Sequence, residues 1–208
     1  MKYNQPLEQG NKFVRCALLG VAIFLCAFAV MPIGTVTRPA ARVGNADVKV
    51  LGTSNLHNWS MEDKDVTCSV QFMYGTSKTL PISLSAFTFT FPVQNLKSGN
   101  SGMDSKAYDA MKAKNGGNIT FAASSSTVTP GSAGHFTVKS DGSLAIAGVS
   151  KSVVLTAACV VNDDGSITCT GTDKLLMTDY QIKPPTYMLG SLRTGNSLTI
   201  DFTMVVRK

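Results

Sequence analysis

The stretch Leu80-Pro-Ile-Ser-Leu-Ser-Ala-Phe-Thr-Phe-Thr-Phe-Pro-Val93 shows the clearest strand pattern in the chain. Three phenylalanines alternate with threonines over residues 87–91, whereas the apolar residues from Ile82 to Ala86 have the opposite parity. A change of parity within one strand requires a bulge or a bend, which we expect near Ala86. Such bends are common where a sheet curls into a barrel. The stretch therefore predicts a strand of a strongly curved β-sheet, with Pro92 at an edge or rim.

The remainder of the domain reads as short strands between turns rich in Gly, Asp, Asn and Pro. Turns are expected at 130–131, 141–142, 163–165 and 195–196, and a polar interruption at 63–65. The expected strands are residues 48–51, 53–60, 66–74, 80–93, 119–128, 135–139, 143–147, 152–161, 166–177 and 197–206. Eight or more antiparallel strands without alternating helices predict an all-β barrel or sandwich.

One helix is expected over residues 101–114. Ser101 or Asp104 can cap its start, lysines crowd its end, and Gly116-Gly117 terminates it. Its narrow apolar stripe is typical of a helix that packs against a core. We expect this helix to close one end of the sheet structure.

The N-terminal segment indicates export. Lys12 and Arg15 precede an uncharged run over residues 16–37, and Ala27-Phe-Ala29 fits a small-x-small cleavage pattern. We expect a signal peptide over residues 1–29, a linker over 30–45 and the β domain over 46–208. The uncharged run is also long enough to span a bilayer, so an uncleaved anchor up to about residue 37 is the alternative. In both cases the domain is expected in the periplasm or outside the cell, with membrane proximity if the anchor persists.

Charge and composition exclude one class of partner. The formal charge of +6 falls to +3 once residues 1–39 are set aside, and the remaining lysines are scattered singly. A nucleic-acid-binding face normally needs clustered basic residues. Nucleic acid is therefore not expected as a partner, and the sequence leaves the oligomeric state open.

Two cysteines flank a turn. With a three-residue loop centred on Asp164, Cys159 and Cys169 lie directly opposite each other across a hairpin, close enough for a bridge. In an oxidising compartment this pair is a candidate disulfide that would staple the hairpin locally. Cys16 and Cys26 belong to the N-terminal targeting segment, which leaves Cys68 without a partner. Cys68 is most simply a small buried apolar residue.

The chain carries no recognisable catalytic constellation. Its two histidines, His57 and His135, are far apart in sequence, and it has no Cys-x-x-Cys, Gly-x-Ser-x-Gly or phosphate-binding glycine loop. A non-enzymatic protein without a metal or cofactor is therefore expected. An enzyme that uses His57 as a base would need a carboxylate or hydroxyl within reach of that ring in an open pocket.

The loop Met177–Gly190 is apolar and aromatic, and Pro184-Pro185 excludes it from a central strand. By itself it is either a plug for the core or a lid over a cavity. It is also the last of four motifs that resemble, in order, the YceI-like family of exported bacterial lipid-binding proteins. The other three are Thr53-Ser-Asn-Leu-His-Asn-Trp59, Met103-Asp-Ser-Lys-Ala-Tyr108 and Gly142-Ser-Leu-Ala-Ile-Ala-Gly-Val-Ser-Lys151.

The resemblance covers residues 47–207 and implies an extended, lipocalin-like antiparallel β-barrel of about eight strands with one helix and an elongated apolar tunnel. It implies a long-chain amphiphile as ligand: a polyisoprenoid, an isoprenoid quinone or a fatty-acid derivative. The cysteine pair is not part of the family's pattern. The resemblance also favours the Met177–Gly190 loop as a lid at the rim of the tunnel over a plug for the core.

We therefore expect a carrier whose tunnel is lined by apolar side chains. The expected lining residues are Trp59, Phe72, Phe87, Phe89, Phe91, Tyr108, Met111, Phe121 and Ile146. The expected closing loop consists of Met177, Tyr180, Ile182, Tyr187, Met188 and Leu189. The candidates for head-group contact are His57, Lys183 and Arg193. The alternative is a structural or protein-interaction module whose barrel is filled and holds no ligand.

Overall fold

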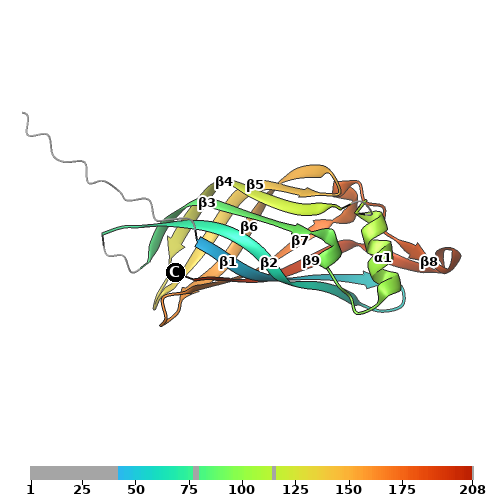
Figure 1. Ribbon diagram of the computed structural model, residues 1–208, viewed down its shortest axis with the longest axis horizontal. Coiled ribbons are helices and arrows are strands. Elements are labelled where there is room, and N and C mark those ends of the chain that lie inside the picture. Colours follow the sequence, from blue (N-terminus) through green and yellow to red (C-terminus); the bar gives the residue numbers. More distant parts are fainter. Residues whose placement is uncertain (1–41, 77–79, 114–115, 208) are drawn as a thin grey trace, which may run out of the picture. The chain divides into compact units, whose positions relative to one another are not determined.

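Eight long antiparallel strands close into a barrel, with one helix across an end (Figure 1). The computed structural model describes residues 42–76, 80–113 and 116–207, and the predicted signal peptide or anchor lies outside them. The described strands are β1 (Arg42–Ser54), β2 (Trp59–Tyr74), β3 (Pro81–Pro92), β4 (Asn118–Pro130), β5 (His135–Ile146), β6 (Val149–Val161), β7 (Ile167–Leu176), β8 (Thr186–Tyr187) and β9 (Leu192–Val206). Neighbours follow chain order up to β7, which pairs with β9, and β9 pairs with β1. The predicted all-β barrel is confirmed.

The predicted bulge in the phenylalanine strand is present. The register between β2 and β3 shifts where Gln71 faces Ala86 but Phe72 faces Leu84, which leaves Ser85 unpaired in the ladder. This extra residue changes the parity of β3. Leu84, before the bulge, and Phe87, after it, therefore both pack into the interior.

Two predicted turns are wrong. Asp141-Gly142 lies inside β5 and Gly195-Asn196 lies inside β9, so each is part of one long strand. Gly142 is covered by the ring of Phe121, and any side chain at position 142 would overlap that ring. Here the missing Cβ makes room for an aromatic ring on the sheet, which is a different use of glycine from turning the chain.

Three further boundaries differ from those predicted. Residues 63–65 continue β2, and the Asp63 side chain is buried. Residues 55–58 form a turn, because the Ser54 hydroxyl accepts the backbone N–H groups of Leu56 and His57. β1 also begins at Arg42, so the last four residues of the expected linker are strand.

Helix α1 (Ser101–Ala110) lies across one end of the barrel (Figure 1). Its cap is Asn100, not Ser101 or Asp104, since the Asn100 side chain accepts the N–H of Met103 at 3.0 Å. Asp104 accepts instead from the backbone and hydroxyl of Ser98, which fixes the preceding loop. Along the part of the chain that the structure describes, no helix is long and apolar enough to cross a membrane.

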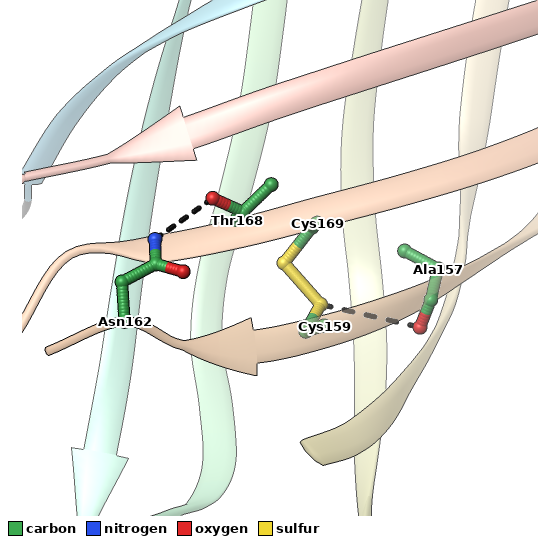
Figure 2. Close-up of a disulfide and its surroundings, with 5 residues drawn as sticks. All are labelled: Ala157, Cys159, Asn162, Thr168 and Cys169. Atoms are coloured by element: carbon green, nitrogen blue, oxygen red, sulfur yellow. Dashed lines mark hydrogen bonds between the residues drawn. A yellow bond between two sulfur atoms is a disulfide. The ribbon is translucent and has the colours of Figure 1, made fainter. Parts of the chain in front are cut away.

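The end of the barrel opposite α1 is filled by side chains and carries a disulfide between Cys159 and Cys169 (Figure 2). The two residues face each other in the β6–β7 ladder, as the hairpin register predicted. This ladder extends only from Ala158 to Val161 on β6. At the start of the turn, the Asn162 side chain donates a hydrogen bond to Thr168 at 2.9 Å. The disulfide thus staples the short paired part of this hairpin.

Aromatic rings occupy the middle of the barrel. The Phe121 ring lies 5.3 Å from that of Phe87 and 5.5 Å, stacked, from that of Phe89, centroid to centroid. Farther toward the disulfide end, Phe72 and Phe136 meet edge to face at 6.1 Å. These are favourable geometries for ring pairs. They fill the interior over this half of the barrel.

Candidate functional site

A cavity of about 690 Å³ occupies the α1 end of the barrel. Its walls come from the strand ends that meet there, from α1 and from the loop after β7. The apolar lining residues are Val50, Trp59, Met61, Leu96, Met103, Ala107, Ala110, Met111, Ile119, Ile146, Leu175, Met177, Ile182, Pro185, Tyr187, Met188, Leu192, Leu198 and Ile200. The small-molecule sites of proteins typically measure about 300–1,000 Å³. The cavity is thus large enough for a ligand, and apolar side chains dominate its surface.

Alternating parity in the strands creates this lining. In β1 and β9, Val50 faces Ile200 across the ladder, and both side chains point inward. From α1, Met103, Ala107 and Ala110 line the cavity at helical spacing. The helix therefore acts as a wall whose apolar stripe faces the cavity.

Hydrogen bonds fix α1 to the barrel. The Tyr108 hydroxyl donates to the carbonyl of Leu96 at 2.7 Å and accepts from the Lys97 ammonium at 3.0 Å. This hydrogen bond raises the pKa of the Lys97 ammonium above its ordinary value. Lys97 in turn exchanges two backbone hydrogen bonds of 2.9 Å with Glu62 on β2. The loop before the helix is thereby joined to the barrel wall.

A few polar groups face the cavity near its mouth. His57 is among them, and its Nδ1 lies 2.7 Å from the carbonyl oxygen of Asn58. The indole of Trp59 donates to the carbonyl of Thr53 at 3.0 Å, and its ring lies so close to Gly52 that a Cβ at position 52 would overlap it. Burial, with a smaller contribution from the Asp104 charge, raises the pKa of the Tyr187 hydroxyl. Burial thus favours the protonated Tyr187 hydroxyl, and the hydrogen bond to Thr53 holds the Trp59 indole in the cavity wall.

About half of the residues singled out from the sequence meet at this cavity. They are Trp59, Met111, Ile146, Met177, Ile182, Tyr187, Met188 and, among the head-group candidates, His57. They come from the β1–β2 turn, β2, the C-cap of α1, β5 and the 177–190 loop. The loop therefore lies at the mouth of the cavity, where the resemblance placed it.

The other candidates lie elsewhere. Phe89, Phe91 and Phe121 pack together in the filled part of the barrel, while Phe72 and Phe87 border only a void of about 30 Å³. Their positions correct the expectation that they line the tunnel, because ring–ring contacts occupy that space. The interior is thus a one-ended cavity, and no continuous tunnel runs the length of the barrel described here.

Five candidates outside the phenylalanine group also lie away from the cavity. Tyr108 holds α1 through its hydroxyl, and Tyr180 is buried in η2 (Met177–Tyr180) without reaching the cavity. Leu189 is fully exposed on η3 (Met188–Gly190). The cationic groups of Lys183 and Arg193 are solvent-exposed and do not line the cavity.

The lining predicted from the sequence missed 12 of the 19 apolar residues that form the cavity wall. Val50, Leu198 and Ile200 line the cavity. The alternation in their strands predicts that they point inward. It does not predict which end of a strand borders a cavity. Met103 and Ala110 extend the helical stripe by a turn on each side of Ala107. A fuller helical-wheel reading could have found them. No group of three or more potential metal-ligating side chains occurs in the described ranges.

Comparison with known proteins agrees with this architecture. The family model of the YceI-like domain matches residues 45–206. BcnA from Burkholderia cenocepacia is similar in structure, with a TM-score of 0.60 at 15% identity over 78% of this chain and 96% of that one. A polyisoprenoid binding domain from Saccharophagus degradans, implicated in plant cell wall breakdown, gives 0.60 at 10% identity over 81% and 99%. The YCEI protein of Campylobacter jejuni gives 0.52 at 20% identity over 70% and 83%.

At these identities the structural likeness shows the fold alone, and a sequence comparison with curated proteins found no match. The family model, however, matches most of the chain, including every strand of the barrel. Together with the closed barrel, the helix and the loop at the cavity mouth, this match confirms the resemblance drawn from the four motifs. The chain belongs to the family of YceI-like domains.

Proposed function

We propose that the protein binds a long-chain amphiphile, without catalysis, and buries the apolar chain of this ligand beneath α1. The observation that carries the proposal is the cavity of about 690 Å³ with its largely apolar lining. An open apolar space of this size in water is costly unless an apolar ligand fills it. The filled half of the barrel then forms the floor on which the chain ends.

The energetics favour a long chain over a short one. Each CH₂ group removed from water contributes about 0.8 kcal/mol. A chain of about ten carbons would thus gain about 8 kcal/mol, against an association cost of about 4–15 kcal/mol. Short-chain molecules would not overcome that cost. The ligand is therefore a chain long enough to occupy most of the cavity.

Within this class we favour a polyisoprenoid. Five of the lining residues are methionines: Met61, Met103, Met111, Met177 and Met188. Methionine is flexible and polarizable, so such a wall adapts to the irregular profile of a methyl-branched chain. The structurally similar domain from Saccharophagus degradans is described as polyisoprenoid binding, which supports the same choice.

The polar end of the ligand is assigned to the mouth. His57 lies at the cavity surface, and the exposed Lys183 and Arg193 belong to the chain segments around it. Cations at this position suit a phosphate or carboxylate head group.

We place the protein in the periplasm or outside the cell, since the N-terminal segment reads as an export signal and the disulfide suits an oxidising compartment.

Trp59 provides a direct test because it is the only tryptophan of the chain and lies in the cavity wall. Titration with a polyprenol is expected to change its fluorescence and to saturate, and native mass spectrometry of protein purified from its own host should show a co-purifying lipid. Ala107→Phe, which fills space beneath α1, is expected to abolish both signals. Ala122→Phe, on the exposed face of β4, is the matched control.

The alternative, a protein-interaction module without a ligand, predicts a different result. In that case the purified protein would be empty and Ala107→Phe would raise stability by filling the cavity. Loss of stability in Ala107→Phe, with no lipid signal in the parent protein, would also reject the proposed function.

A further inference from the structure

The most exposed large apolar side chains of the described residues gather at the cavity mouth. Leu189, Met188 and Leu56 have exposed fractions of 109%, 81% and 71%, respectively. Each exceeds the other exposed apolar residues, among which Ile82 is next at 59%. Leu56 lies in the β1–β2 turn, and the other two lie in η3. Scattered single exposures need no explanation, but a group at the entrance of a cavity does.

Asn55 ties these two turns into one unit. Its side-chain amide donates to the carbonyl of Ser191 at 2.8 Å and its side-chain oxygen accepts the N–H of Arg193 at 2.8 Å. The backbone N–H of Asn55 donates to the carbonyl of Arg193 at 3.1 Å. The Leu56 turn and the η3 turn are 130 or more residues apart in sequence but are held side by side. We call them together the mouth tip, residues 54–58 and 186–193.

The backbone of η3 is strained in a way that presents these side chains. Met188 and Leu189 have φ of 48° and 56°, in the left-handed region that side chains other than glycine disfavour. Gly190 follows at 92°. The fold thus uses a disfavoured conformation to hold two large apolar residues in water. Strain of this kind is typical of functional loops.

The chain segments of the mouth tip and its flanks carry charges of one sign, while the Asp104 carboxylate of α1 acts on Tyr187. Residues 53–59 and 181–195 contain Lys183, Arg193 and His57 but no Asp or Glu. The Arg193 Nε donates to the carbonyl of Gly190 at 2.9 Å, which holds the guanidinium beside the exposed leucine. Apolar tips flanked by cations are suited to an anionic lipid surface, where each cation near the surface contributes favourably.

We propose that the mouth tip docks on a lipid bilayer, with Leu56, Met188 and Leu189 inserted at the headgroup–acyl boundary and Arg193 on lipid phosphates. This inference rests on the proposed lipid-binding function. Met188 both lines the cavity and projects from the tip, so an apolar chain can pass between bilayer and cavity without crossing water.

The shape of this region favours a bilayer over a protein partner. The hairpin that contains β8 and η3 projects beyond α1 (Figure 1). A stable protein interface buries about 800 Å² per partner, and three side chains on a projecting tip do not provide it. A soft, apolar layer accepts a projecting tip readily.

Docking can be tested in the full chain with a single reporter tryptophan. In the Trp59→Phe background, Leu189→Trp is compared with Val154→Trp, an exposed apolar position on the barrel wall. Vesicles contain equal parts of phosphatidylcholine with brominated acyl chains and anionic phosphatidylglycerol. We expect the bromines to quench the tryptophan at position 189 and not the one at 154. This result is independent of any tethering by the N-terminal segment, since that segment would affect both variants equally.

A second measurement follows transfer of a polyprenol from vesicles to the protein. Leu56→Ser/Leu189→Ser is expected to slow transfer about tenfold or more, since burial of one leucine contributes at least that factor. The matched variant Ile82→Ser/Val154→Ser should transfer at the parent rate. Both variants should retain the affinity for detergent-solubilised polyprenol, because none of the four residues lines the cavity.

The outcomes separate the two proposals. An unquenched tryptophan at 189 overturns docking even if polyprenol binds, and a protein partner then becomes the occupant of the tip. Equal slowing by the two double variants also overturns it. Quenching at 189 in a protein that does not bind polyprenol would uphold docking and reject the proposed ligand.

Discussion

Removal of Phe121 is expected to cost much stability and little lipid affinity, whereas removal of Leu198 should cost less stability and more lipid affinity. Phe121 is 1% exposed, and its ring contacts those of Phe87 and Phe89 in the filled half of the barrel. Truncation of such a phenylalanine to alanine costs about 3–5 kcal/mol, since it leaves a void lined by rings that have lost contacts. A domain of this kind has about 5–15 kcal/mol of stability, so Phe121→Ala should still fold.

Leu198 already borders empty space. It lies half-buried on β9, opposite Gly52, and lines the cavity. Leu198→Ala enlarges an existing space and creates no new one, so only part of the transfer free energy is lost, about 1 kcal/mol. The same truncation removes contact with a bound chain. We expect the affinity for a polyprenol to fall about fivefold, which corresponds to about 1 kcal/mol.

Two assays separate these effects. Urea unfolding followed by far-ultraviolet circular dichroism gives the free energy of unfolding, and the fluorescence of Trp59 gives the lipid affinity. The reasoning would be refuted if Phe121→Ala lost less than about 1 kcal/mol of stability and weakened lipid binding as much as Leu198→Ala. That result would mean that the ligand reaches the phenylalanines and that the barrel is open along its length.

Three further predictions concern stability. Replacing Cys159 and Cys169 with alanine should lower the free energy of unfolding by about 3 kcal/mol in urea titrations, since the bridge closes a loop with a sequence separation of 10; an unchanged value would contradict the assignment of a staple. Burial raises the pKa of the Cys68 thiol to about 11. Because the unfolded chain loses this proton at lower pH than the folded protein, the free energy of unfolding should fall between about pH 9 and 11 by about 2–3 kcal/mol relative to Cys68→Ala. Parallel pH profiles of the two proteins would argue against this contribution of Cys68. One oxygen of the buried Asp63 accepts the N–H of Asp65, whereas the other has no hydrogen-bond partner among the described residues. Asp63→Asn should therefore raise stability against heat and urea by about 1–3 kcal/mol. A decrease in stability would reveal a partner for the carboxylate.

Local patterns predicted most of the barrel because they depend on short stretches of chain. The parity change near Ala86 predicted the bulge, and the spacing around Asp164 placed Cys159 opposite Cys169. The errors came where a distant residue overrides a local preference. Gly142 has the sequence of a turn but remains in a strand because the Phe121 ring covers it. The cap of α1 at Asn100 was missed because several polar residues precede the helix and compete for that role.

The sequence by itself determined which side chains point into the barrel, because alternation assigns every second residue of a strand to the interior. It did not determine which of these inward residues border a cavity. Phe121 and Ile146 both point inward, yet the first is locked among other rings and the second faces open space. That difference depends on position along the barrel axis and on what closes each end, which parity does not encode. Only the tertiary structure decided where a ligand fits, because it places phenylalanines from the middle of the barrel toward the disulfide end and α1 with the 177–190 loop at the other end.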